Sequence, residues 1–364
     1  MKVSTVLVIV FFLFALIIGI GATSYFYAQS VDVVEEQVYA HLETTVYSRA
    51  LHIQDFLESD MDRVRIITAV DCVQGYIENI VNEVDVEAST ALIEKCVKDV
   101  SEGNNNFFEI IVADKNGDVI VSHSQIREEH DHETLNIKDK EGFIEGMKGF
   151  KVIDAHEDQG IATLGYVGPI KSVDEKEVNG VLIIHQAFDG EVNKFDSAST
   201  KGLGINNIVL DKTGIGETGE TYLINGEGYA ITPLLFVEDA VLKQKVDTLG
   251  SRDCLEERFR HLELHEEEEE QAHEEEHIGH EVVEVFLDYR GKKVIGTHLY
   301  IPEMDWCLLA EVDEEDVLGK QRELFQKVTL TIIIFLVVIV TLIGFFVGRF
   351  IDKRVVLKKG SKRL

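Results

Sequence analysis

The sequence predicts an α+β protein in which a long N-terminal helix and two small sheets lie between two apolar helices. Three observations support this fold. The 364-residue chain has uncharged apolar runs near both ends, at residues 6–28 and 328–347. Residues 31–82 carry apolar side chains at helical spacing without a proline. Two groups of short strand-like segments then follow.

The two apolar runs predict transmembrane helices, because each is long enough to cross about 30 Å of hydrocarbon as a helix. For the first run the alternative is a cleaved signal peptide, whose apolar region is typically about 7–15 residues long. The run at 6–28 is longer and includes the aromatic residues Tyr25, Phe26 and Tyr27, which are typical of membrane interfaces. We therefore expect an uncleaved anchor.

Positive charge predicts the orientation. Lys2 precedes the first run, and seven Lys or Arg residues against one acid follow the second. Cytoplasmic segments carry such an excess. We therefore expect cytoplasmic tails at 1–5 and 348–364, with the segment between the spans outside. The C-terminal tail begins like a HAMP linker and is too short for a folded output domain.

Acidity excludes one class of function. The chain has 66 acidic and 35 basic residues and a formal net charge of −31. A nucleic-acid-binding protein needs a basic surface to neutralise phosphates, and no such surface is predicted. Part of the acidity is local, since residues 256–281 are rich in Glu and His.

The outer segment is predicted to contain helices followed by two sheet units. A shorter helix is expected at 86–101, after the long one. Residues 107–123 predict two strands around an Asn116-Gly117 turn, and 161–170 and 180–188 predict two more. A second group of strands is expected at 221–225, 229–232, 281–289, 292–300 and 306–312. A helix that starts near Glu314 should continue into the second apolar run.

Four cysteines lie in the outer segment, and an even number in an oxidising compartment predicts two disulfides. Sequence order favours pairing Cys72 with Cys96 and Cys254 with Cys307, although three connectivities are possible. The alternative is four free buried thiols.

Two segments carry a resemblance to a known family. Residues 214–225 read GIGETGETYLIN, and residues 305–313 read DWCLLAEVD after Ile301-Pro302. These segments resemble the double Cache (dCache) sensor family, and the likeness extends over about 30–350. The resemblance implies helices at 29–104, a membrane-distal PAS-like module at 105–200, a membrane-proximal one at 201–313 and a juxtamembrane helix at 314–327, with the spans at 6–28 and 328–347.

Such domains are the extracytoplasmic inputs of histidine kinases, chemotaxis receptors and cyclic-nucleotide enzymes. The resemblance therefore implies a ligand-binding receptor in the cell membrane that is not itself an enzyme. It also implies a homodimer formed through the long helices. A separate histidine kinase or another cytoplasmic partner would supply the output, unless the chain is a fragment of a longer receptor.

Three other motifs match signatures of different functions only in part. Gly214-x-Gly216-x-x-Gly219 matches a dinucleotide fingerprint, but a predicted strand follows it where that fingerprint requires a helix. His273–His277 spells HExxH within Glu-rich sequence and without an apolar helix face. Asp114-x-Asn116-x-Asp118 lacks the later glycine and glutamate of a calcium loop, so a hairpin is expected there.

The tract at 256–281 has two interpretations. One is a solvated insertion in the proximal module. The other is a site for a divalent transition metal, since imidazole is a good ligand for such ions. Its candidate ligands include two i, i+4 pairs: His261, His265, His273, His277 and His280.

The family resemblance places the small-molecule ligand in the distal module. The amino-acid-binding subset uses an Arg-x-Trp pair, a tyrosine and an aspartate, and neither the pair nor the tyrosine occurs at the matching positions here. An α-amino-acid ligand is therefore disfavoured. The remaining candidates are Lys140, His156, Tyr166, His185 and Asp189. The alternative is that Tyr166 and His185 are satisfied sheet residues; if His185 faces the pocket, an anion is favoured over an amine.

These observations favour a transmembrane sensor that binds a small molecule outside the cell and signals inward. The alternative is a membrane-anchored binding module that uses the His/Glu tract for a metal or solute and passes no signal. A surface hydrolase is disfavoured, because no nucleophile and base are recognisable together.

Overall fold

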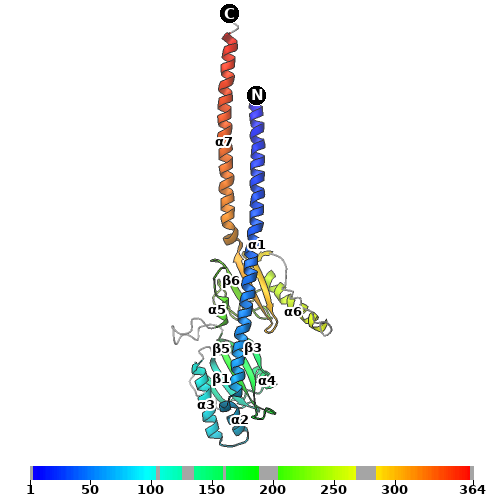
Figure 1. Cartoon of the computed structure of the whole chain (residues 1–364), viewed down its shortest axis with the longest axis vertical. Helices are drawn as coiled ribbons and strands as arrows, with labels where there is room; N and C mark the ends of the chain where they lie inside the picture. Colours follow the sequence, from blue (N-terminus) through cyan, green and yellow to red (C-terminus); the bar gives the residue numbers. More distant parts are fainter. Residues whose placement is uncertain are drawn as a thin grey trace. The chain divides into compact units, whose positions relative to one another are not determined.

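The computed structural model describes residues 3–103, 107–124, 135–158, 161–187, 204–267 and 284–360 (Figure 1). The chain divides into two compact units. One unit contains Met1–Ala40 and Asp313–Leu364, and the other contains His41–Val312. The helix α1 (Val3–Ala69) begins in the first unit and ends in the second.

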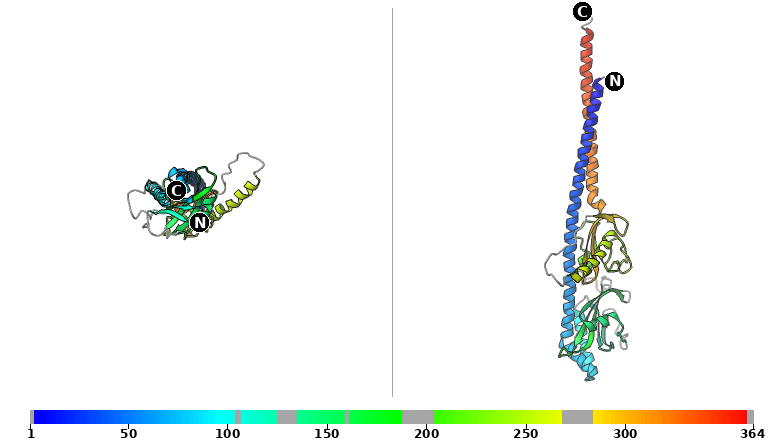
Figure 2. Two further views of the ribbon diagram at one scale, coloured as in Figure 1. Left: turned by 90° about the horizontal axis from the view of Figure 1, so that it is seen from below. Right: turned by 90° about the vertical axis from the view of Figure 1, so that its right-hand side faces the viewer.

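The first unit is an antiparallel pair formed by the N-terminal part of α1 and by α7 (Glu314–Gly360) (Figure 2). The rings of Tyr27 and Phe325 have centroids 4.4 Å apart. A Cβ atom on Gly19 would lie 3.3 Å from Ile332 Cγ2, so glycine permits close contact between the helices here. Both helices are long and apolar enough to cross a membrane by length and composition.

The second unit contains a helix break at Val70 that the sequence analysis did not predict. One helix was expected over 31–82, but α1 ends at Ala69 and α2 (Asp71–Val81) follows. Val70 between them has extended backbone angles, with φ −73° and ψ 137°. The break allows α2 to bury its apolar side chains, and Cys72 bonds to Cys96 of α3 (Val86–Gly103).

The first module contains a five-stranded antiparallel sheet in the order β2-β1-β5-β4-β3. The expected strands are present as β1 (Phe107–Asp114), β2 (Val119–Ser124), β4 (Ile161–Lys171) and β5 (Val178–Ala187). The strand β3 (Lys151–Asp158) and the helix α4 (Glu141–Lys148) were not predicted.

The predicted turn at Asn116-Gly117 is confirmed, and a carboxylate stabilises it. Asp114 Oδ1 accepts hydrogen bonds from the backbone N–H groups of Asn116 and Asp118, each at 2.9 Å. Gly117 has φ of 89°, and a Cβ atom there would lie 2.7 Å from the backbone nitrogen of Lys138. Only glycine fits this position without strain.

The two faces of this sheet contact different helices. A Cβ atom on Gly168 of β4 would lie 3.3 Å from Val64 of α1, so this face of β4 packs on α1. Val167 points the other way and packs with Phe143 of α4 in an apolar cluster. The α4 face therefore carries a core of its own, which underlies the candidate site.

The second module contains a four-stranded sheet in the order β6-β9-β8-β7. Its strands are β6 (Glu220–Ile224), β7 (Glu284–Leu287), β8 (Lys293–Ile301) and β9 (Trp306–Asp313). Residues 229–232 were expected to form a further strand, but they make only isolated bridges from Tyr229 and Ala230. The helices α5 (Ile205–Val209) and α6 (Leu249–Glu267) complete the module.

Two local predictions in the second module are confirmed. Gly214 and Gly216 have φ of 85° and 83°, and they precede the strand β6 rather than a helix. Cys254 of α6 is bonded to Cys307 of β9. Both disulfides that the sequence favours are thus present.

Buried Arg49 joins α1 to the second module. Its guanidinium donates hydrogen bonds to the backbone oxygens of Val209 and Asp211 and to the hydroxyl of Thr221.

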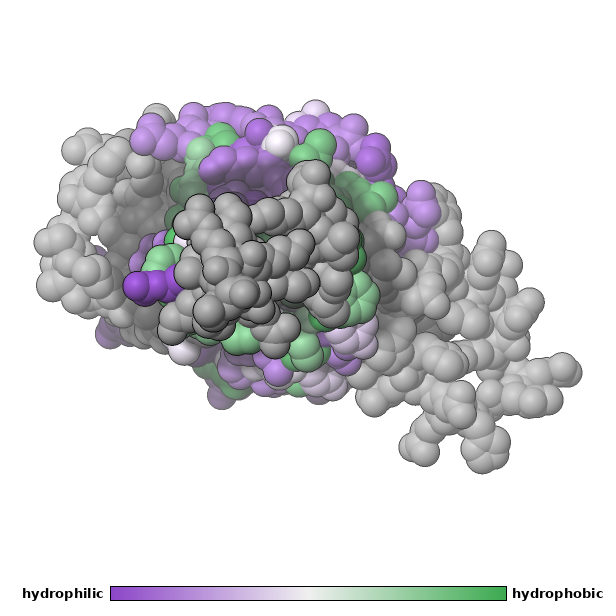
Figure 3. Space-filling view, turned by 90° about the horizontal axis from the view of Figure 1, so that it is seen from above, coloured by the Kyte–Doolittle hydropathy of each residue, from purple (hydrophilic) through white to green (hydrophobic). Residues whose placement is uncertain are grey.

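Hydrophilic residues predominate on the described part of the face drawn in Figure 3, with smaller apolar patches between them. This surface agrees with the acidic composition of the chain.

Candidate functional site

Two histidines lie side by side on the α4 face of the first sheet. His185 of β5 pairs in register with Gly165 of β4, and His156 of β3 lies on the other side of the same glycine. The centroids of the two imidazole rings are 5.7 Å apart, with the rings edge to face. Gly165 has no side chain to separate them.

A bulge in β3 brings His156 to this face. Ile153 pairs with Gly165 and His156 pairs with Thr163, so β3 advances three residues where β4 advances two. In a regular strand, residues three apart point to opposite faces. The extra residue allows Ile153 and His156 to share one face, which is the kind of reorientation that bulges commonly produce near functional sites.

His185 is paired with a buried carboxylate. Its Nδ1 lies 2.7 Å from Oε2 of Glu109, which faces it in register from β1. The side chain of Glu109 is only 2% exposed and that of His185 is 15% exposed. A carboxylate so deeply buried requires a partner, and the imidazole Nδ1–H is the donor. Glu109 therefore fixes the orientation and tautomer of His185.

The ring of His156 is fixed in the same way. Its Nδ1 donates to the backbone oxygen of Asp154 at 2.9 Å. Each ring thus uses Nδ1 for a contact with an oxygen of the protein, which fixes its orientation. The site combines two imidazoles and a buried carboxylate on the sheet face that also carries the apolar core cluster of Ile111, Phe143, Ile153, Val167, Val181 and Ile183.

The structure describes two of the other predicted site residues, Lys140 and Tyr166. Lys140 is exposed and precedes the first turn of α4. Tyr166 is buried on the opposite face of the sheet, beside Asp60 of α1. Adjacent strand residues point to opposite faces, and Gly165 occupies the α4 face. Asp189 lies outside the described residues.

Tyr166 belongs to a polar cluster between α1 and the sheet. Asp60, Tyr166 and Gln186 are all buried, and Asp60 also forms an ion pair with Arg63. Burial raises the pKa of the Asp60 carboxyl and of the Tyr166 phenol. Gln186 follows His185 directly in β5, so this cluster lies behind the histidine site, across one layer of sheet.

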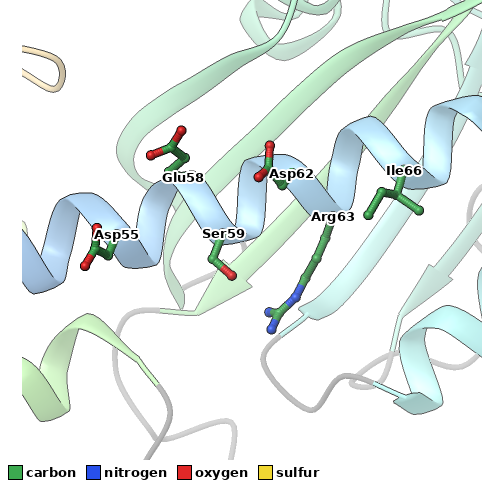
Figure 4. Close-up of a pocket in the computed structure, with 6 residues that line it drawn as sticks. All are labelled: Asp55, Glu58, Ser59, Asp62, Arg63 and Ile66. Atoms are coloured by element: carbon green, nitrogen blue, oxygen red, sulfur yellow. The ribbon is translucent and has the colours of Figure 1, made fainter.

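A charged groove runs along the exposed face of α1 (Figure 4). All six residues that line it come from this helix: Asp55, Glu58, Ser59, Asp62, Arg63 and Ile66. Among the described residues no second element contributes to its lining, and the groove is open to solvent. It therefore lacks the convergent polar groups of a ligand site.

The predicted metal site at 256–281 stays a prediction. His261 and His265 lie within α6, whereas His273, His277 and His280 lie outside the described residues. Within the described part of the chain, no three His, Cys, Asp or Glu side chains are grouped so that they could hold a metal ion.

Three important residues escaped sequence reasoning. Glu109 had one signal, since it is a charged residue inside the apolar strand FFEIIVAD. Trp306 was noted only as part of the family segment 305–313, and Asp154 had no signal, because their contact joins residues far apart in the sequence. The indole N–H of Trp306 donates to Oδ1 of Asp154 at 2.6 Å, and Asp154 is the residue whose backbone oxygen holds His156.

Comparison with known proteins agrees with this architecture. The dCache model of the Cache domain matches residues 28–321. The extracellular domain of mmHK1S-Z2, assigned as a histidine kinase, is similar in structure with a TM-score of 0.51 and 12% identity, covering 79% of this chain and 99% of that one. The sensory domain of the Campylobacter jejuni chemoreceptor Tlp3 (CcmL) gives the same score and identity and covers 79% and 98%. No curated protein sequence matches.

The chain belongs to the dCache family of Cache domains, as its sequence motifs indicated. The family match covers both modules, the helices α2 and α3 and most of α1 outside its first apolar run. Domains of this family are sensory, ligand-binding and non-catalytic.

Proposed function

We propose that this chain is a two-pass membrane sensor whose outer domain binds a small polar molecule at the His156–His185 site and passes the bound state to a cytoplasmic signalling partner. The observation that carries the proposal is the buried Glu109–His185 pair beside His156. The family to which the chain belongs supports it.

The site favours a particular ligand chemistry. Glu109 places a buried carboxylate beside His185, so the pair does not favour a strongly charged anion. The ring of His156 and the Glu109–His185 pair are polar groups set beside an apolar cluster, a combination typical of small-molecule pockets. We therefore favour a small polar molecule over the anion that His185 alone suggested.

The arrangement of the first unit supports a two-pass topology. Gly19 packs near Ile332 and Tyr27 near Phe325, so the two apolar helices are antiparallel. An antiparallel pair of spans places both termini on one side of the membrane. The basic C-terminal tail favours the cytoplasmic side. The partner would be a separate histidine kinase or similar protein, and the sensor would act as a homodimer.

Ligand binding can be tested on the full chain in lipid nanodiscs. Thermal unfolding with and without members of a metabolite library should yield a compound that raises the melting temperature. That stabilisation should be lost in His185→Asn and kept in the control His123→Asn, which changes another histidine of the first sheet. The proposal is wrong if no compound stabilises the chain or if His185→Asn leaves the stabilisation intact.

Topology can be tested separately with single added cysteines. The four native cysteines are all in disulfides and will not react. A membrane-impermeant maleimide applied to intact cells should label Glu175→Cys, in the turn between β4 and β5, and should leave Ser361→Cys unlabelled until the cells are opened. The reverse pattern would contradict the proposed orientation.

A further inference from the structure

We propose that the contact between Asp154 and Trp306 transmits the state of the histidine site to β9, the strand that leads into α7. This inference rests on the proposed sensor function and names the route by which that function would operate. Asp154 belongs to the first module and Trp306 to the second, so the bond connects the two sheets.

The first step of the route lies in the bulge of β3. Asp154 and Ala155 occupy the register shift between Ile153 and His156. The backbone oxygen of Asp154 accepts from His156 Nδ1 at 2.9 Å, while its carboxylate accepts from Trp306 at 2.6 Å. One residue therefore contacts the ligand site through its backbone and the second module through its side chain.

The second step is the strand β9. Trp306 is fully buried, and an indole N–H in such a place needs an acceptor. Every residue of β9 from Trp306 to Asp313 is buried, and α7 begins at the next residue, Glu314. Cys307 is also bonded to Cys254 of α6. Because β9 is paired with β6 and β8 and continues directly into α7, a displacement of Trp306 would be passed along the strand to the start of α7.

Both Trp306 and His156 affect the pKa of the Asp154 carboxyl group. Burial is the largest influence on the pKa of Asp154 and raises it, whereas the Trp306 hydrogen bond and the nearby His156 act in the opposite direction. The backbone oxygen of Asp154 accepts from His156 and its carboxylate accepts from Trp306, so a ligand that moves His156 would also change the bond to Trp306.

The simpler interpretation is that Asp154 and Trp306 only hold the modules together. The two interpretations differ in whether a change at His156 alters the structure beyond the Asp154–Trp306 contact. Trp306 is the one tryptophan of the chain, so 5-fluorotryptophan gives the full-length protein a single fluorine resonance at this position. The pair Tyr27→Cys and Phe325→Cys reports on the apolar helices, since the native rings lie 4.4 Å apart.

The experiment uses the full chain in nanodiscs and His156→Asn as the perturbation of the site. His123→Asn on β2 is the matched control. We expect His156→Asn, but not His123→Asn, to shift the fluorine resonance. In the variant with cysteines introduced at positions 27 and 325, we also expect His156→Asn to change the rate of disulfide cross-linking between these positions about threefold or more.

Second-site variants give the decisive result. In Trp306→Phe and Asp154→Ala, His156→Asn should no longer change the cross-linking rate. In Asp154→Asn, whose amide oxygen still accepts from the indole, part of the effect should return. Thermal unfolding of each variant checks that it is folded. An equal effect of His156→Asn in all backgrounds overturns the route.

The route and the sensor function can fail independently. If the library yields a ligand but the cross-linking effect survives in Trp306→Phe, the route is wrong and the sensor proposal stands. If no compound binds but the fluorine resonance and cross-linking follow His156→Asn as described, the route stands and the proposed function does not.

Discussion

The phenol of Tyr222 on β6 donates a 2.7 Å hydrogen bond to Oε1 of Glu311 on β9, in the core of the second module. Oε2 of the same carboxyl has no hydrogen-bond partner among the described residues. Glu311 also faces Glu220 in register across the two strands. Two carboxyl groups thus lie close together away from water, which disfavours the charged form of both.

Replacing Glu311 should change how stability depends on pH. Burial raises the pKa of Glu311 to about 8, above its usual value near 4.5. The folded state therefore binds the proton more tightly, and the stability gained from it is present at low pH and lost as pH rises through about 8. Glu311→Gln should remove this loss, so that the variant exceeds the wild type by about 2 kcal/mol or more at pH 9.

Thermal unfolding between pH 5 and pH 9 tests this. The melting temperature of the wild type should fall towards pH 9 more steeply than that of Glu311→Gln. The exposed Glu227→Gln is the control and should follow the wild type. Parallel curves for wild type and Glu311→Gln would contradict the assignment.

Removing Glu109 should destabilise the first module. Glu109→Ala leaves His185 without its carboxylate partner on the α4 face, and an interrupted buried hydrogen bond to a charged group costs about 2 kcal/mol. Glu109→Gln should cost less, since the amide oxygen can still accept from Nδ1. Urea unfolding measures both. Glu157→Ala on β3, which changes an exposed carboxylate, should have little effect, and an equal loss there would show that the pairing is unimportant.

The disulfides predict that the stability of the chain against unfolding depends on redox conditions. Cys72–Cys96 closes a separation of 24 residues, and loss of such a cross-link costs about 3 kcal/mol in the chain-entropy account. The double variant Cys72→Ser, Cys96→Ser should therefore unfold at lower urea than the oxidised wild type. Added reductant should destabilise the wild type but change the variant less. Non-reducing peptide mapping that joined Cys72 to Cys254 would refute the connectivity.

A pair of glycine variants tests the hairpin between β1 and β2. Gly117→Ala places a methyl group 2.7 Å from the backbone nitrogen of Lys138 at a positive φ, so it should lose more than about 1 kcal/mol of unfolding free energy. Gly149→Ala is the control, because nothing lies within 4 Å of its Cβ position and its φ of 168° is extended. Equal losses at the two positions would contradict the turn geometry.

Sequence patterns predicted the strands whose side chains alternate regularly, and one irregular strand was missed for a physical reason. In β3, Ile153 and His156 share a face although they are three residues apart. The bulge therefore removes the two-residue period on which strand prediction depends. The helix break at Val70 was missed for the opposite reason, since the helical spacing of apolar residues continues across it.

The candidate site was predicted in part. His156 and His185 were both selected as polar residues of the distal module, where the family resemblance places the ligand. Their proximity depends on Gly165 and on strand order, neither of which the local sequence defines. Glu109 was missed because its partner lies on a strand far along the chain. Pairings of this kind follow from sheet topology rather than from spacing.

The bond between Cys254 and Cys307 has a mechanical consequence for the acidic tract. It fixes the α-carbons of α6 and β9 at 6.1 Å, one residue from Trp306. A load on α6 is therefore delivered to β9 through a covalent link, which does not weaken when hydrogen bonds exchange with water. Anything that pulled on the tract at the end of α6 would act on the strand that continues into α7, even if the histidine site were empty.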